Sequence, residues 1–165
     1  MSKVKNSTFV TRIDLSKPLR DTMITLLNQQ LADTFDLFSQ VKQAHWNVKG
    51  INFIQLHLLF DDLAGELIEF TDSIAERATA LGGKAMGTVR LAAAQSQLPE
   101  FPTEIVTDKQ VVEVLAQRYG AYASAIRTAI ATATDDGDAG TADLFTEISR
   151  TVDKHLWFLE AHIQA

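Results

Sequence analysis

The chain has 165 residues, 46% of them apolar, which suits one globular domain with a single hydrophobic core. It contains no cysteine, so disulfides, thiolate zinc sites and cysteine nucleophiles are excluded. No apolar run approaches the roughly 20 residues of a membrane span, and Met1–Arg12 lacks the apolar segment of a secretory signal, so we expect a cytoplasmic protein without membrane contact. The net charge of −6 argues against broad nucleic-acid binding by the folded surface and fits a protein that concentrates cations.

The amino terminus differs in charge from the rest of the chain. The first acidic residue is Asp14, and the basic residues before it are Lys3, Lys5 and Arg12. We therefore divide the chain into a flexible basic arm, residues 1–14, and an acidic domain, residues 15–165. The three basic residues are the candidate DNA contacts.

The domain opens with two long helical patterns. Ser16 is placed to cap the first helix, which runs at apolar spacings of three and four to about Val48 and breaks at Gly50. A capping-box pattern at Asn52 and Gln55 starts the second helix, which Gly82-Gly83 ends.

A long connection, Lys84–Val106, follows and contains a short helix over Arg90–Gln95. Thr107 with Gln110 forms a second capping-box pattern at the start of a third helix, which ends near Asp135. The last helix spans roughly Gly140–Ile163. Strand patterns are nearly absent, so the sequence predicts an all-α, ferritin-like four-helix bundle, in which the long connection with its short helix lies between the second and third long helices.

Five potential metal ligands are concentrated in the first half of the domain: His45, His57, Asp61, Asp72 and Glu76. On one continuous helix, the last four fall at roughly 0°, 40°, 60° and 100°, on one stripe. Asp61 and Asp72 are about 16 Å apart along that helix, too far for one ion to bridge. Two antiparallel copies across a two-fold axis would bring the His/Asp end of one helix to the Asp/Glu end of the other, so the pattern predicts a metal site shared between two subunits.

Imidazole with carboxylate suits iron, copper, zinc and nickel, and carboxylates favour the ferric product over the ferrous reactant. Iron redox chemistry therefore fits better than structural zinc, although zinc is an alternative occupant of the same ligands. The competing interpretation is a solvated acidic face, with Glu76 paired to Arg77 or a lysine. A di-iron site inside the bundle would need Glu-x-x-His on two helices, and that motif is absent.

Three stretches of the chain resemble the Dps family, the mini-ferritins also called DNA-binding proteins from starved cells. They are His45–Phe53 (HWNVKGINF), Asp72–Ala78 (DSIAERA) and Asp153–Glu160 (DKHLWFLE), and the resemblance extends over nearly the whole chain from about Leu15. All five ligand positions of the family are filled. Trp46, beside a ligand, is a candidate radical trap, but we favour a packing aromatic.

The resemblance implies a homododecameric shell with a ferroxidase centre at each two-fold interface, where His45, His57 and Asp61 come from one subunit and Asp72 and Glu76 from its partner. It implies oxidation of Fe(II), typically by hydrogen peroxide, storage of Fe(III) mineral, and protection of DNA and the cell from oxidative damage. It also implies iron entry through three-fold pores lined by acidic residues at the start of the last helix, here Asp138, Asp143 and Glu147. For Asp138 and Asp143, the alternative is stabilisation of the helix amino terminus.

The resemblance leaves DNA binding open. Twelve short arms on one shell could act together through avidity, and binding would weaken steeply with salt. The alternative function is thus a nucleoid-associated, DNA-compacting protein with secondary iron chemistry. His155 and His162 lie seven residues apart, so a helix would place them on one face; we interpret them as ordinary surface or interface histidines rather than a second metal site.

Overall fold

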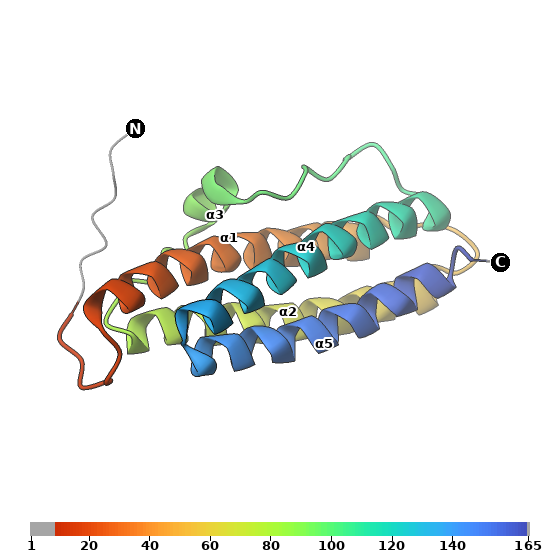
Figure 1. Cartoon of the computed structure of the whole chain (residues 1–165). Coiled ribbons are helices and arrows are strands. Elements are labelled where there is room, and N and C mark those ends of the chain that lie inside the picture. The colour runs from red at the N-terminus through yellow and green to blue at the C-terminus, as the bar shows by residue number, and fades with distance from the viewer. Residues whose placement is uncertain (1–8, 165) are drawn as a thin grey trace.

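The computed structural model describes residues 9–164, in which four long helices form a bundle (Figure 1). The long helices are α1 (Lys17–Asn47), α2 (Phe53–Ala80), α4 (Asp108–Asp136) and α5 (Ala139–Ala161). The short α3 (Val89–Gln95) lies on the connection between α2 and α4, beside α1. α1 pairs with α2 and α4 pairs with α5, which confirms the predicted all-α ferritin-like bundle.

The helix starts are close to the predicted positions, but two of the three predicted caps are wrong. Ser16 Oγ accepts a hydrogen bond from the Leu19 N–H at 3.4 Å, as expected. Asn52 makes no capping bond and instead donates from Nδ2 to Asp108 Oδ2 at 3.2 Å. The Thr107 hydroxyl likewise turns to Gln110 Oε1 at 2.6 Å. Side-chain contacts between segments far apart in the chain have replaced one of these local caps.

The loop after α1 is bound to the start of α4. Lys49 donates from its backbone N–H to Val106 O at 2.7 Å and accepts from the Asp108 N–H at 2.9 Å. Gly50 has φ +145°, and a Cβ there would lie 2.6 Å from the Asp108 carboxylate. Glycine is therefore required at this position. This contact fixes the end of α1, and with it His45.

The long connection is held against the bundle by a polar stripe on α1, four residues at helical spacing that bond to Gln95–Pro99. The stripe consists of Gln29, Asp33, Asp36 and Gln40, whose side chains bond to Gln95 O, Gln97 N, Ser96 Oγ and Pro99 O respectively. From α4, the nearly buried Arg118 adds hydrogen bonds to Pro99 O and Glu100 O. These bonds satisfy backbone N–H and C=O groups of the connection, which forms few hydrogen bonds within itself.

Apolar and aromatic side chains fill the interior. The largest fully buried ones include Tyr119, Tyr122, Phe60 and Phe145. Among the described residues, the buried carboxylates are Asp33 and Asp138, and both bond to neighbouring groups rather than to each other. This part of the chain therefore offers no paired carboxylates for a metal inside the bundle. None of the helices in residues 9–164 has the length and apolar character needed to span a membrane.

Candidate metal centre

His45 on α1 and His57 on α2 form a stacked pair. Their ring centroids are 3.8 Å apart and their planes differ by 18°. His45 Nδ1 lies 2.7 Å from the backbone oxygen of His57, and His57 Nδ1 lies 2.9 Å from the backbone oxygen of His45. Each ring is thus fixed by the main chain of the helix that carries the other.

These reciprocal contacts determine the tautomer of both rings. A carbonyl oxygen only accepts hydrogen bonds, so Nδ1 must carry the proton in both histidines. In the neutral rings, both Nε2 atoms then hold a free lone pair, the form that binds a metal. The sequence predicted the two ligands but not the backbone contacts that orient them.

Asp61 lies one turn beyond His57 and faces the same region. His45 Nε2 is 3.9 Å from Asp61 Oδ1. The same oxygen accepts a 2.7 Å hydrogen bond from Lys42 Nζ, which holds the pKa of Asp61 below its usual value. The sequence did not predict the contact of Lys42 with Asp61, although Lys42 lies three residues before His45 and therefore on the same face of α1. An arriving cation would have to displace its ammonium group from this oxygen.

Asp72 and Glu76 lie on the distant part of α2. That helix is continuous from Phe53 to Ala80, as the predicted stripe requires, and both carboxylates are exposed. In residues 9–164, no three His, Cys, Asp or Glu side chains are close enough to hold one metal ion. Within one subunit the five residues therefore remain two separate groups. The guanidinium of Arg77 bonds to Asp138 rather than to Glu76. The exposure of Asp72 and Glu76 agrees, within one subunit, with the alternative of a solvated acidic face.

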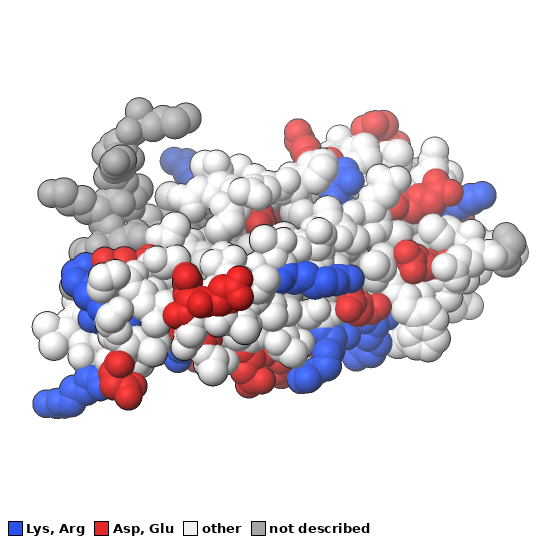
Figure 2. Space-filling model, viewed as in Figure 1, with Lys and Arg blue, Asp and Glu red and all other residues white. Residues whose placement is uncertain are grey.

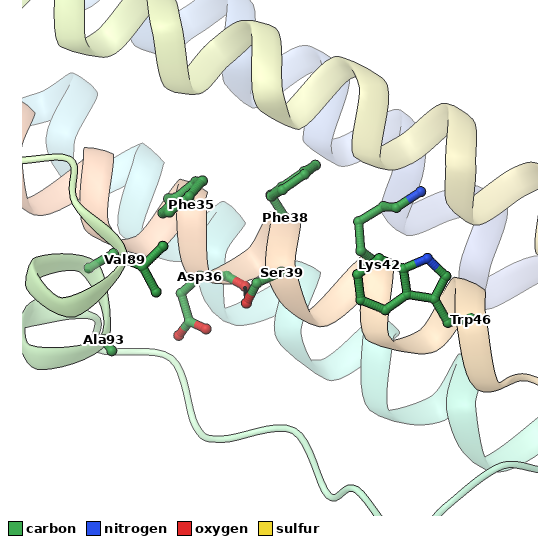
Figure 3. Close-up of a pocket in the computed structure, with 9 residues that line it drawn as sticks. Phe35, Asp36, Phe38, Ser39, Lys42, Trp46, Val89 and Ala93 are labelled. Atoms are coloured by element: carbon green, nitrogen blue, oxygen red, sulfur yellow. Dashed lines mark hydrogen bonds between the residues drawn. The ribbon is translucent and has the colours of Figure 1, made fainter.

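An apolar groove of about 340 Å³ lies between α1 and α3 (Figure 3). Phe35, Phe38 and Trp46 from α1 and Val89 from α3 line it, with Lys42 Nζ lying 5.7 Å from the centroid of the Trp46 ring. Trp46 is 65% exposed and Val89 70%. Within one subunit, Trp46 is therefore not the packed aromatic that the sequence suggested.

The three acidic residues predicted to line a pore occupy different environments. Asp138 is only 2% exposed and caps α5, accepting hydrogen bonds from the Thr141 N–H and Oγ1. It also pairs with Arg77 Nη2 at 2.7 Å. Its position thus agrees with the alternative that it stabilises the helix terminus. Asp143 and Glu147 are exposed and remain available for a channel lining.

The two remaining histidines are separated. His155 is 1% exposed, so its interpretation as a surface residue is wrong, and its Nε2 lies 3.2 Å from Glu66 Oε1. His162 is exposed at the end of α5 and bonds to Phe158 O. The pairing of His155 with Glu66 was not predicted, because the two residues are 89 positions apart in the sequence.

Of the candidate DNA contacts, Lys3 and Lys5 lie outside the described residues, and Arg12 is exposed. Figure 2 shows acidic and basic side chains interspersed over one face of the bundle, with no continuous basic patch on that face.

Known proteins resemble the chain over nearly its full length. A family profile for the ferritin-like domain matches residues 24–165. The DNA protection during starvation protein of Agrobacterium fabrum is 43% identical over 95% of this chain and 97% of that protein. Among solved structures, DpsC from Streptomyces coelicolor superposes with a TM-score of 0.92 at 32% identity, covering 100% of this chain and 97% of that one. Mycobacterium smegmatis Dps gives 0.91 at 28% identity, covering 96% and 95%.

The fold and the extent of these matches define a ferritin-like protein. Within that class, the chain belongs to the Dps family.

Proposed function

We propose that this protein is a ferroxidase and iron-storage protein. It oxidises Fe(II), preferably with hydrogen peroxide, and holds Fe(III) mineral inside a homododecameric shell. The observation that carries the proposal is the His45–His57 pair, in which backbone carbonyls leave both Nε2 lone pairs free beside the Asp61 carboxylate. Membership of the Dps family supports the same conclusion.

In the proposed assembly, His45, His57 and Asp61 of one subunit face Asp72 and Glu76 of a second copy. The separation of the two groups along α2 supports this arrangement, because neither half supplies enough ligands alone. The apolar groove between α1 and α3 supports it too, since a second copy packed there would bury its exposed Trp46 and Val89 side chains. Iron would thus bind where two subunits meet.

The chemistry follows from the ligands. Two Fe(II) ions each give one electron to a peroxide, whose O–O bond breaks to yield two hydroxide-level oxygens. Because both electrons are delivered together, the one-electron step that releases hydroxyl radical is avoided. Anionic Asp61, Asp72 and Glu76 favour the product, because they stabilise the additional positive charge of Fe(III). Zinc is a substitute occupant of the same ligands, not the working metal.

Asp143 and Glu147 are the proposed entry residues. They are exposed and one turn apart near the start of α5, so symmetry-related copies would form rings of carboxylates. Such rings concentrate cations at a channel mouth.

The test is anaerobic loading of the chelator-stripped assembly with Fe(II), followed by a stoichiometric pulse of hydrogen peroxide. Asp61→Ala is compared with wild type and with Asp62→Ala, which removes the adjacent exposed carboxylate. We expect fast ferric absorbance in wild type and Asp62→Ala and its loss in Asp61→Ala, in shells of about twelve subunits by scattering mass. Equal, slow rates in all three proteins would refute the ferroxidase.

The second candidate function is DNA compaction in the nucleoid, and the name of the Agrobacterium relative, DNA protection during starvation protein, favours it. Removal of residues 1–12 should abolish DNA retention in a low-salt mobility assay and leave iron oxidation unchanged. Retention by the truncated shell would show that Lys3, Lys5 and Arg12 are not the contacts. Either function fits a cytoplasmic protein.

A further inference from the structure

Two neighbouring side chains in the core of the bundle each carry a polar atom that has no hydrogen-bond partner. Tyr119 on α4 is fully buried, and its hydroxyl has no hydrogen-bond partner among the described residues. His155 on α5 is 1% exposed, and its Nδ1 also lacks one. The two rings meet edge to face, with centroids 5.8 Å apart and planes at 72°. Buried polar atoms without partners are uncommon in folded proteins and call for an explanation.

The second nitrogen of His155 gives the direction of the pair. Nε2 lies 3.2 Å from Glu66 Oε1. An ionised carboxylate only accepts, so Nε2 carries the proton and Nδ1 holds a lone pair. Burial lowers the pKa of His155, against the opposing effect of Glu66, so the ring is a neutral base at physiological pH. Tyr119 thus carries a proton and the neighbouring Nδ1 holds a lone pair. The two atoms do not hydrogen-bond to each other in this structure, so the hydroxyl must move toward Nδ1 for the proton to pass.

This pair is connected to solvent through Glu66. The Glu66 carboxylate is 44% exposed and lines an open pocket of about 500 Å³ together with His155 and three further carboxylates, Asp61, Asp62 and Glu69. A proton taken up by His155 Nδ1 can therefore be balanced by transfer of the Nε2 proton to Glu66 and from there to water. The order Tyr119, His155, Glu66 leads from the centre of the core to this opening.

Tyr122 provides an internal contrast. It is also fully buried on α4, three residues later, but its hydroxyl bonds to Thr34 Oγ1 at 2.6 Å. Thr34 in turn donates to Gln30 O, so no base stands ready for the Tyr122 proton. Burial raises the pKa of both tyrosines, that of Tyr119 far above its usual value. Neither phenol can lose its proton before it is oxidised. Oxidation of either ring must therefore remove the electron and the proton together.

We propose that Tyr119 is a redox-active tyrosine whose phenolic proton passes to His155 and Glu66 when the ring is oxidised. The oxidant is a one-electron species such as hydroxyl radical. The tyrosine gives one electron to the radical, which becomes hydroxide, and its O–H proton goes to His155 Nδ1. The Nε2 proton then leaves through Glu66 and converts the hydroxide to water. The net change is Tyr–OH plus hydroxyl radical giving Tyr–O radical plus water.

The assignment does not depend on the ferroxidase, because any one-electron oxidant that reaches the opening would suffice. The test therefore uses the metal-free assembled protein and a photogenerated ruthenium(III) polypyridyl oxidant, and it records the tyrosyl radical by electron paramagnetic resonance. The chain has only two tyrosines, so two variants assign the signal completely. Shell size and helical content measured on each variant confirm that it is assembled.

We expect a tyrosyl signal in wild type and Tyr122→Phe and its loss in Tyr119→Phe. His155→Phe, which removes the base and keeps an aromatic ring, should also lose it, while His162→Phe should not. A signal that survives in Tyr119→Phe, that persists in His155→Phe, or that is absent from wild type while the oxidant is consumed would overturn the proposal.

Discussion

His45 and His57 each hold the other's imidazole through a backbone carbonyl, with Nδ1–O distances of 2.7 and 2.9 Å. The main chains of two helices thereby fix both rings. A metal binding at the Nε2 atoms meets ligands whose tautomer and orientation are already set.

Lys42→Met should strengthen binding of the first divalent ion. The substitution removes the ammonium group that lies 2.7 Å from Asp61 Oδ1 while keeping an unbranched side chain in the groove. We expect roughly a two- to fivefold lower dissociation constant for Zn²⁺ by calorimetry, since ion pairs near the surface are weak. Lys17→Met, which disrupts an exposed ion pair at the start of α1, is the control and should leave the constant unchanged. Weaker binding in Lys42→Met would mean that the lysine assists the metal.

Substitutions of Asp138 and Asp143 should have different effects, the first on stability and the second on iron uptake. Asp138→Ala removes the cap of α5 and leaves Arg77 without its partner, so we expect a loss of about 2 to 4 kcal/mol in unfolding free energy. Asp143→Asn changes an exposed side chain and should cost less than about 0.5 kcal/mol. If the pore proposal holds, it should slow iron uptake with no change in peroxide stoichiometry. Urea unfolding and stopped-flow uptake of the two variants measure these effects, and unchanged uptake in Asp143→Asn combined with Glu147→Gln would refute the pore.

The two buried tyrosines should differ in what their hydroxyls contribute to stability. Tyr122→Phe loses the hydrogen bond to Thr34 and should cost about 1 kcal/mol. Tyr119→Phe removes a buried hydroxyl with no partner and should be neutral or stabilising by up to about 1 kcal/mol. Denaturant midpoints of the two variants, compared at one protein concentration, provide the measurement. An equal loss in both would show that the Tyr119 hydroxyl finds a partner in solution.

Asp33 should contribute more to the stability of the bundle at acidic pH than at neutral pH. Burial raises the pKa of Asp33, although hydrogen bonds from Gln97 and Gln29 oppose the shift. A carboxyl with a raised folded pKa binds more protons folded than unfolded, so its stability contribution falls as pH rises from the unfolded value of about 3.9 through the folded pKa. Asp33→Asn lacks this titration. Its unfolding free energy minus that of wild type should therefore increase as the pH rises above about 4 and level off toward lower pH; a difference that decreases with rising pH would contradict the sign.

Local patterns predicted the helices well, because apolar spacing and glycine breaks are encoded over a few residues. Each predicted helix end lies within about two residues of the structure. The predicted break at Gly50 falls in the loop just after α1, where its φ and the nearby Asp108 leave no room for a side chain. The caps at Asn52 and Thr107 failed, because their side chains bond to other side chains instead of to the helix N–H groups.

The site was predictable only in part. The spacing of His57 and Asp61 on one helix pointed to a shared face, and the structure brings His45 beside them. Lys42 and the burial of His155 depend on how α1 meets α2 and how α5 meets α2, which no local pattern records. Asp138 shows the same limit, since its partner Arg77 is 61 residues away.

The Arg77–Asp138 pair also has a mechanical consequence. Arg77 follows Glu76 on α2, while Asp138 begins the helix that carries Asp143 and Glu147. In the proposed shell, this pair is a rigid joint between the channel wall and the acidic half of the oxidation site. A shift of α5 that widened the channel would also move Glu76. The permeability of the channel to iron and the rate of iron oxidation would therefore be coupled.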